Sequence, residues 1–293
     1  MHSLATEARV DEVTTVPAAA APPTPAGLVH PATVAAPDGN RRWGLALRVL
    51  GPLGALGIWW LLTGTGIVQP TALASPLVTA KAFWHLLTTQ NLLGDIGVSL
   101  ARAGGGLAIG AGLGFLLGIF VGLFRLGEEL LDSSLQMFRT IPFPAVIFIF
   151  IIWFGIGEEA KVLLIALATM FPMYLNTANG VRNVDRKVVE AARTFGLRGR
   201  HLVGQVVVPL ALPSILTGLR YSTGISVIAL VFAESVNANL GIGALANQAA
   251  SFNQVPVLMV CILVYAVLGI GADLIVRLIE RLAMPWRRQV SVR

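Results

Sequence analysis

Long apolar stretches separated by polar loops constrain this chain more than any other feature. A helix needs about 20 mainly apolar residues to cross the hydrocarbon core of a bilayer. Six stretches meet that requirement when breaks are placed at polar and Gly/Pro clusters, namely residues 43–63, 97–124, 134–155, 159–180, 210–234 and 256–282. Only 12% of the residues are charged, against about a quarter in a soluble domain. The sequence therefore predicts an all-α integral membrane protein with six transmembrane helices.

The uneven distribution of Lys and Arg between the loops predicts an orientation, because cytoplasmic loops are enriched in both. One side holds Lys81, Lys161 and Arg102. Both termini and the Arg182–Arg200 loop are on the other side and are expected in the cytoplasm. The same topology explains the net charge of +6, so nucleic acid is not expected as a partner. The basic residues assigned to the cytoplasmic side are Arg9, Arg41, Arg42, Arg125, Arg139, the cluster from Arg182 to Arg200, Arg277, Arg281, Arg287, Arg288 and Arg293.

The two ends of the chain are expected to lie outside the membrane domain. Residues 1–42 are rich in Ala and Pro, and this composition predicts a disordered cytoplasmic tail. A cleaved signal peptide would need its apolar core near the start of the chain, so no cleavage is expected. The membrane domain is placed at residues 43–284, with a cytoplasmic loop at about 181–208, and residues 285–293 form a second tail.

Five glycines recur every four residues in the second apolar stretch: Gly106, Gly110, Gly114, Gly118 and Gly122. This spacing places them on one face of a helix, where the absence of side chains lets another helix approach closely. We predict tight packing within the bundle; the alternative is a role in dimer formation or in sliding during transport.

Local features are expected in three other segments. Pro142 and Pro144 should kink the third apolar stretch, and such a kink often lies near a transport pathway. A short amphipathic helix is expected around Thr79–Leu87, and residues 235–255 are polar but uncharged. Each of these two outer loops is able to dock a partner or to lie in the membrane interface.

The polar loop from Val189 to Pro213 reads VEAARTFGLRGRHLVGQVVVPLALP. It belongs to a strongly basic region that must face water. Asp185 can cap a short helix, Ala191 and Ala192 give that helix a flat small-residue face, and Gly196 can end it in the left-handed conformation. The sequence predicts a compact helical knob here.

The spacing of Glu190, Ala191, Ala192, Gly196 and Pro209 resembles the E-A-A-x3-G-x9-I-x-L-P motif of ABC importer permeases, with valines at the Ile and Leu places. In that family the motif forms the coupling helix, which sits in a groove of the cytoplasmic ATPase subunit. The resemblance implies ATPase coupling for these five residues. The alternative is an ordinary solvated loop that contains E-A-A by chance.

From about residue 90 onward, the order of further short motifs resembles the nitrate, taurine and aliphatic sulfonate branch of this family, which implies a type I ABC importer permease fold. The fifth apolar stretch departs from the family's Gly-x-Ala-Trp run, which weakens any inference about the solute; it reads Gly224, Ile225, Ser226 and Val227. The matching motifs are Ser99, Leu100 and Arg102; Arg139, Ile141 and Pro142; WFGIGE at 153–158; Gly180, Val181 and Arg182; LPSILTGLR at 212–220; Ala233 and Glu234; Leu240, Gly241, Ile242 and Gly243; Pro285 and Trp286.

Ionisable residues inside spans are costly in lipid and are functional candidates. Arg220 has no acid three or four residues away in sequence, so it is expected to face the bundle interior. Snorkelling or helix bonding is the favoured explanation, and attraction of an anionic solute is the alternative. The candidates for the translocation pathway are Arg102, Arg139, Pro142, Arg220 and Glu234. A structural salt-bridged face is expected on the sixth helix from Asp273, Arg277, Glu280 and Arg281.

Nucleotide hydrolysis would require a Gly-rich phosphate loop ending in Gly-Lys. None of the lysines, Lys81, Lys161 and Lys187, follows a glycine. We therefore expect no catalysis, cofactor or metal in this chain, with ATP and Mg bound by a partner ATPase. The single Cys261 can form no intrachain disulfide.

The leading interpretation is the permease subunit of an ATP-driven ABC importer in the bacterial cytoplasmic (inner) membrane. It would take up a small anionic solute, such as an aliphatic sulfonate, taurine or nitrate, from an extracytoplasmic binding protein. Its expected partners are a second copy or a paralogous permease, two cytoplasmic ATPase subunits and membrane lipid. The alternative is a stand-alone ion-coupled secondary transporter or channel, a class that usually has mid-span acids. A membrane-embedded enzyme ranks third, because no nucleophile, base or metal-ligand set is evident.

Overall fold

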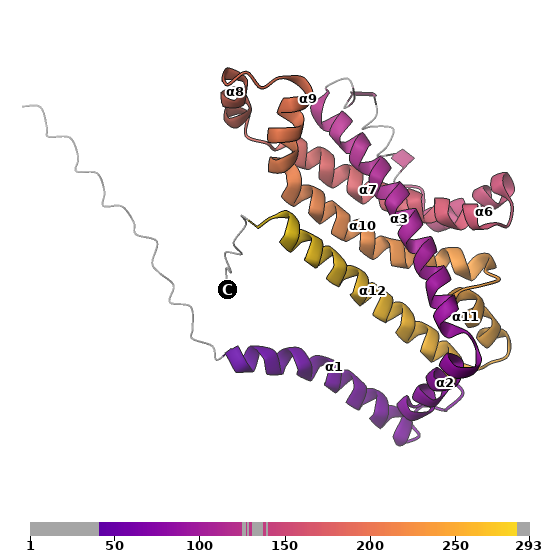
Figure 1. Cartoon of the computed structure of the whole chain (residues 1–293). Coiled ribbons are helices and arrows are strands. Elements are labelled where there is room, and N and C mark those ends of the chain that lie inside the picture. Colours follow the sequence, from indigo (N-terminus) through magenta and orange to yellow (C-terminus); the bar gives the residue numbers. More distant parts are fainter. Residues whose placement is uncertain (1–40, 125–126, 128, 131–136, 139, 286–293) are drawn as a thin grey trace, which may run out of the picture. The chain divides into compact units, whose positions relative to one another are not determined.

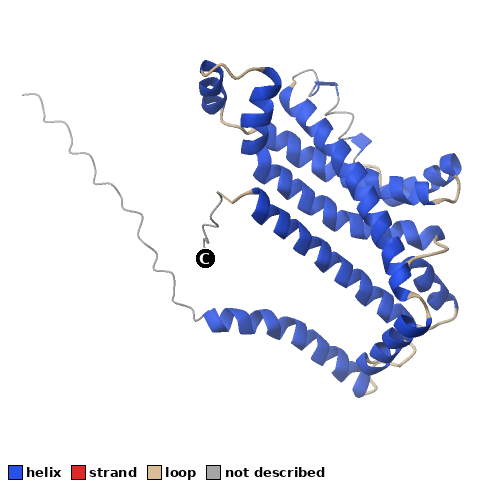
Figure 2. Ribbon diagram, in the orientation of Figure 1, coloured by secondary structure: helices blue, strands red, loops and turns tan. Residues whose placement is uncertain are grey.

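The computed structural model describes residues 41–124, 127, 129–130, 137–138 and 140–285, and the regular structure among them is helical (Figures 1 and 2). Most of the predicted tails, residues 1–40 and 286–293, lie outside the described residues. Packing is considered within Val49–Val292, the larger of two compact units. The helices are α1 Arg41–Gly64, α2 Pro76–Thr89, α3 Leu92–Leu123, α6 Phe143–Phe154, α7 Glu158–Arg182, α8 Arg186–Thr194, α9 Gly199–Leu202, the π-helical turn η2 Val203–Val207, α10 Val208–Asn237, α11 Ile242–Ser251 and α12 Val255–Ala283.

Four of the helical segments in the described part of the chain are long and apolar enough to cross a membrane. They are α3, α7, the segment Gly199–Val236, and α12. The first and third predicted spans correspond to shorter apolar helices, Leu50–Gly64 and Phe143–Phe154. The prediction of an all-helical membrane protein is thus confirmed, whereas the count of six spans stays a prediction.

The expected kink at Pro142 and Pro144 is wrong. Pro142 lies at the N-cap of α6 and Pro144 lies in its first turn. The amides of a first turn have no partner inside the helix, so proline costs little there and its fixed φ favours helix initiation. The two prolines therefore begin α6 instead of bending a longer helix.

The glycine-rich face of α3 packs against α7, as predicted. A Cβ atom built on Gly106 would lie 2.5 Å from the Cβ of Ile165, and one on Gly118 would lie 2.5 Å from the Cβ of Thr177. A Cβ atom on Gly114 would overlap the backbone carbonyl of Met170. Side chains are excluded from this contact because the two backbones approach each other directly.

Helix α7 lies between α3 and α10. Gly180 of α7 approaches Ser214 of α10, and Gly218 of α10 approaches Asn176 of α7. Helices α3, α7 and α12 start at the end of the bundle that carries α11 and run towards the end that carries α8, whereas α10 runs in the opposite direction (Figure 1). The candidate functional residues lie at these two ends of the bundle, the α8 end and the α11 end.

The predicted short outer helix is also present, as α2. Its N-cap Ser75 accepts a hydrogen bond from the amide of Val78, and Leu86 is buried. Leu86 packs with Leu92 of α3, Ile242 of α11 and Val260 of α12 in a cluster of buried residues. This cluster fixes α2 and α11 on the bundle.

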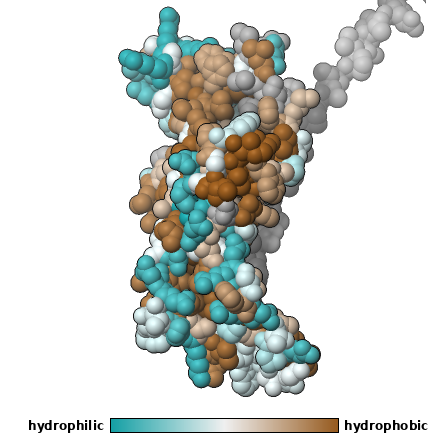
Figure 3. Space-filling model, turned by 90° about the vertical axis from the view of Figure 1, so that its right-hand side faces the viewer, coloured by the Kyte–Doolittle hydropathy of each residue, from teal (hydrophilic) through white to brown (hydrophobic). Residues whose placement is uncertain are grey.

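Large apolar side chains remain exposed on many of the helices, and brown patches are visible on the face drawn in Figure 3. Helix α6 alone exposes Phe148, Ile149, Ile152, Trp153 and Phe154. Beside it, α6, α7 and α10 enclose an apolar hollow of about 650 Å³. Such surfaces need lipid or another protein to cover them.

The α3–α7 contact predicts a strong difference between neighbouring glycines. Gly114→Leu should destabilise the bundle by about 1 to 3 kcal/mol, because its side chain would overpack a helix contact. Gly112→Leu is the matched control, since nothing lies within 4 Å of a Cβ built at Gly112. Thermal unfolding of the purified proteins measures both. Equal stability of the two variants would show that the glycine face is not a close contact.

Candidate functional site

The helix predicted in the polar loop is α8, and its two ends have the expected local structure. The side chain of Asp185 accepts a hydrogen bond of 2.9 Å from the amide of Lys187. Gly196 has a φ of +87°. The amide of Gly196 donates to the carbonyl of Arg193, and that of Leu197 donates to the carbonyl of Ala192, which is the hydrogen-bond pattern of a Schellman motif. Both the Asp185 cap and the Gly196 stop are therefore confirmed.

Helix α8 has two different faces. Arg186, Val189, Glu190 and Arg193 line a hollow between α8 and the ends of α3 and α7. The opposite face carries Val188, Ala191 and, at the C-cap, Phe195. The small-residue face is only partly as predicted, because Ala191 is exposed while Ala192 is buried.

The sequence interpretation missed Phe195, whose side chain is 87% exposed. A large aromatic residue in a basic loop, directly before the glycine that ends a helix, was the available signal. A phenylalanine so exposed at the tip of a polar loop is a candidate anchor for a partner protein.

After the non-helical residues 195–198, the chain enters the bundle as continuous helix. Helix α9 and the π-helical turn η2 lead directly into α10. Pro209 is the second residue of α10; it has no amide hydrogen to donate to the preceding turn. Single π-helical turns inside helices frequently occur at functional sites.

A network of buried charges occupies the α11 end of the bundle, and Arg102 of α3 lies at its centre. Arg102 is 3% exposed. It binds Glu158 of α7 through two hydrogen bonds, from Nε at 2.5 Å and from an Nη atom at 2.7 Å. Its other Nη atom donates to Glu234 at 2.6 Å and to the carbonyl of Leu240 at 2.7 Å. Four hydrogen bonds thus join Arg102 to α7, to α10 and to the turn after α10.

The carboxylate of Glu234 is fully buried and has four donors. Besides Arg102, it accepts hydrogen bonds from the hydroxyl of Ser99 at 2.7 Å, the hydroxyl of Tyr265 at 2.8 Å and the amide of Gly243 at 3.0 Å. A buried carboxylate is tolerated only when it is paired and hydrogen-bonded in this way. Glu234 therefore links α3, α11 and α12 to the end of α10.

The turn between α10 and α11 fits closely over this network. Gly241 has a φ of +99°, and its amide donates to Asp95. A Cβ on Gly241 would lie 2.7 Å from an Nη atom of Arg102, so a side chain would displace the guanidinium. The glycine is required here both by its backbone conformation and by the space it leaves.

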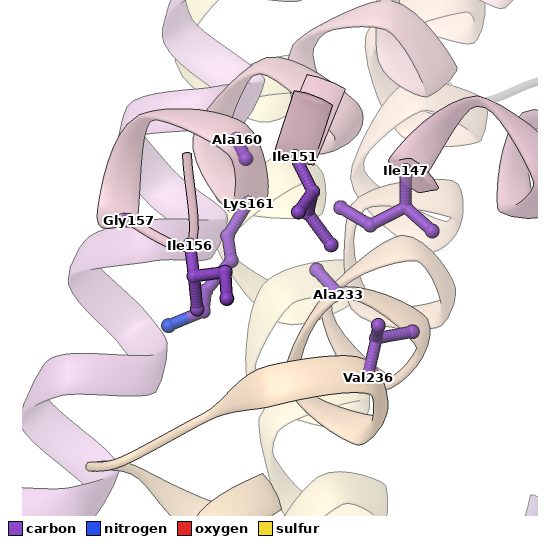
Figure 4. Close-up of a pocket in the computed structure, with 8 residues that line it drawn as sticks. All are labelled: Ile147, Ile151, Ile156, Gly157, Ala160, Lys161, Ala233 and Val236. Atoms are coloured by element: carbon purple, nitrogen blue, oxygen red, sulfur yellow. The ribbon is translucent and has the colours of Figure 1, made fainter. Parts of the chain in front are cut away.

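Lys161 completes the charge balance. Its Nζ donates to Glu158 at 2.9 Å, so Arg102 and Lys161 face Glu158 and Glu234. Figure 4 shows the ammonium turned away from the apolar residues Ile147 and Ile151, while its stem runs beside Ile156. Both cations of the network are thus paired with carboxylates.

The predicted pathway residues are distributed over separate places. Arg102 and Glu234 are joined in the network, and Pro142 begins α6. Arg139 lies outside the described residues. Arg220 has acid partners on another helix: it donates to Glu280 at 2.6 Å and lies 3.7 Å from Asp273, which agrees with the helix-bonding interpretation.

Spacing along one helix could not indicate these partners, because both acids come from α12, which packs beside α10. The side chain of Arg220 is 43% exposed. On the sixth helix, the predicted Asp273–Arg277 pair is present at 2.7 Å.

Several members of the network were not proposed as site residues from sequence. Ser99, Glu158 and Gly241 stood within motifs of the family resemblance, but nothing in those motifs indicates mutual contact. Asp95, Lys161 and Tyr265 belong to none of the motifs identified in the sequence.

Across the described residues, no group of three or more His, Cys, Asp or Glu side chains is placed to hold a metal ion.

Comparison with known proteins gives consistent matches. The family model described as "Binding-protein-dependent transport system inner membrane component" matches residues 111–284. A permease protein named for aliphatic sulfonates transport, SsuC of Escherichia coli (strain K12), is 45% identical over 235 residues, which cover 80% of this chain and 89% of the relative. The SsuC of Bacillus subtilis (strain 168) is 40% identical over 249 residues, covering 85% and 90%. The taurine transport system permease protein TauC of Escherichia coli (strain K12) is 30% identical over 259 residues, covering 85% and 94%.

Among solved structures, a chain of the inward-facing MetNI methionine ABC transporter matches with a TM-score of 0.50 and 20% identity, covering 68% of this chain and 98% of that chain. At this identity the match concerns the fold alone, which is that of type I importer permeases. With a family match over more than half of its length and two relatives at 40% and 45% identity, the chain belongs to the inner-membrane components of binding-protein-dependent transport systems, the permeases of ABC importers.

Proposed function

We propose that this chain is the translocation subunit of an ATP-driven importer for a small anionic solute. An aliphatic sulfonate is the first candidate and taurine the second, since relatives are named for their transport; nitrate is the third, from the sequence motifs. Two copies of the chain would form the pathway in the bacterial inner membrane, two cytoplasmic ATPase subunits would supply the energy, and an extracytoplasmic binding protein would deliver the solute.

The observation that carries this proposal is the form of α8. It is a short helix, capped at both ends, that stands between two membrane spans and exposes an aromatic residue. We propose that Val188, Ala191 and Phe195 form the surface that docks in the ATPase. Glu190, Ala192, Gly196 and Pro209 would set the position and orientation of α8 on the bundle.

The charge network has a different proposed role. It joins α3, α7, α10, α12 and the turn before α11 at the end opposite α8. We propose that the network holds the outer ends of these helices together as one rigid body. Displacement of α8 would then move the helices as a group. Because its charges are matched, an anion would find no surplus cation there, and Arg102 is better explained as a structural centre than as an anion lure.

For Arg220 the proposed pathway role meets a competing explanation. Its partners on α12 are sufficient to explain an arginine in this position, since they hold α10 and α12 together. A role towards the solute requires that the exposed part of the guanidinium attract an anion while these contacts are kept.

Coupling through α8 predicts that Phe195→Ala reduces co-purification of the ATPase and abolishes solute-stimulated ATP hydrolysis in the reconstituted complex. Removing an aromatic anchor at an interface commonly costs about 2 kcal/mol or more. Phe252→Ala is the matched control, because Phe252 is 69% exposed just after α11 and should not affect the ATPase. Wild-type ATPase binding by Phe195→Ala would contradict the docking surface.

The orientation of α8 is tested within the same assay. Gly196→Val should also uncouple transport, because a β-branched residue at a φ of +87° is strained. Gly196→Asn should retain much of the activity, since Asn tolerates the left-handed conformation.

A stand-alone secondary transporter would transport solute without any ATPase, and solute uptake by the chain alone would overturn the proposed function.

The charge network predicts non-additive effects on stability. Arg102→Met should destabilise the protein by about 3 to 5 kcal/mol, because it leaves the buried carboxylate of Glu234 without its cation. Combining it with Glu234→Gln removes one charge of each sign and should recover part of the loss. Arg277→Met removes a partly exposed ion pair and should cost no more than about 1 kcal/mol. Additive losses in thermal unfolding of the Arg102 and Glu234 variants would exclude a coupled network.

The two explanations for Arg220 predict different effects of the variants Arg220→Gln and Glu280→Gln. Arg220→Gln should assemble with the ATPase but take up less solute if Arg220 attracts the anion, and Glu280→Gln should then retain uptake. If Arg220 only joins α10 to α12, the two variants should lose stability and uptake to the same extent. Uptake and ATPase assembly measured on both variants decide between these outcomes.

A further inference from the structure

A second hollow lies at the α8 end of the chain and is separate from the docking surface. It has a volume of about 1210 Å³ and is enclosed by the ends of α3 and α7, by α8 and α9, and by η2. Its walls combine basic and apolar side chains. The hollow is not used in the proposed coupling to the ATPase.

The first kind is basic. Arg182, Arg186, Arg193 and Arg200 line the hollow, together with one acid, Glu190. Arg186, Arg193 and Arg200 are exposed. The local balance strongly favours an anion, in contrast to the matched charges of the Arg102 network.

The second kind is apolar. The wall formed by the helix ends and by η2 has no charged group other than Arg182. A soluble anion would gain nothing from this wall. Its apolar members are Val121, Leu123, Phe124, Val181, Val184, Val189, Leu202, Val203 and Val207.

The position of the arginines on α8 separates this hollow from the ATPase. Arg186, Val189, Glu190 and Arg193 are spaced by three or four residues and so share one helix face, which lines the hollow. Lys187, Val188, Ala191 and Phe195 do not line it. The two faces can therefore be occupied at the same time.

We propose that the hollow binds an anionic phospholipid of the cytoplasmic leaflet, with its phosphate among Arg186, Arg193 and Arg200 and its acyl chains against the valine-rich wall. Basic pockets between membrane helices on the cytoplasmic side are suited to anionic head groups, and arginine binds phosphate with several donors at once. The lipid would lie between α8 and the bundle and would stabilise the position of α8. This proposal rests on the cytoplasmic orientation of α8 in the proposed function.

The test uses the full chain in nanodiscs containing phosphatidylcholine and phosphatidylglycerol, followed by native mass spectrometry of retained lipid. Wild-type protein should retain phosphatidylglycerol in preference to phosphatidylcholine. Arg186→Gln combined with Arg193→Gln should lower that retention roughly tenfold or more. Lys187→Gln combined with Arg198→Gln is the matched control: it removes two charges from the same segment outside the hollow, and it should retain the lipid as the wild type does.

Photoreactive acyl chains locate the lipid independently, and cross-links should fall within residues 181–207 or 121–124. Equal retention by the two double variants, or cross-links elsewhere only, would overturn the proposal. Displacement by glycerol phosphate as effective as that by phosphatidylglycerol would show a soluble-anion site instead and would also overturn it. Lipid retention does not depend on transport, so loss of ATPase coupling with lipid binding intact would count against the proposed function alone.

Discussion

The close approach of α3 and α7 determines where the other helices of the bundle can lie. In lipid there is little hydrophobic force between helices, so their association depends on packing distance and on polar contacts. The glycines of α3 bring its backbone against α7, and Gly180 and Gly218 do the same between α7 and α10. Helix α7 is thus held from two sides, and its first residue, Glu158, reaches Arg102 of α3. The charge network therefore depends on the glycine contact beneath it.

Burial explains the completeness of that network. An ionised side chain inside a membrane protein is costly unless paired, and Arg102 and Glu234 are both almost inaccessible. Each makes four hydrogen bonds, and two of these use backbone groups, the carbonyl of Leu240 and the amide of Gly243. Because backbone partners require a fixed loop, the network also determines the path of the chain between α10 and α11.

Features that depend on residues close together in the sequence could be predicted from the sequence. Features that depend on contacts between distant residues could not. The Asp185 cap, the Gly196 stop and the glycine face of α3 are local or periodic, and all three are present. Pro142 was misread because a proline inside an apolar stretch can either bend a helix or begin one. The partners of Arg220 come from another helix, about 60 residues along the chain, and no helical spacing reveals them. Tyr265 joins the network only because α12 meets α3, α7 and α10 there.

The two ends of the bundle differ in charge: cations are paired with carboxylates at the α11 end, whereas basic side chains are in excess at the α8 end. This difference agrees with their proposed roles. At the α11 end, Arg102 and Lys161 are both paired with carboxylates, and Arg102 and Glu234 at the centre of the cluster are buried. At the α8 end, exposed arginines face a single glutamate and an apolar wall, so this end is completed only by other molecules. In the proposed function, the α11 end holds the helices together while the α8 end receives the force from the ATPase. The excess of basic side chains around the hollow at the α8 end agrees with an anionic lipid bound there, because that charge and the apolar wall complement a phosphate and its acyl chains.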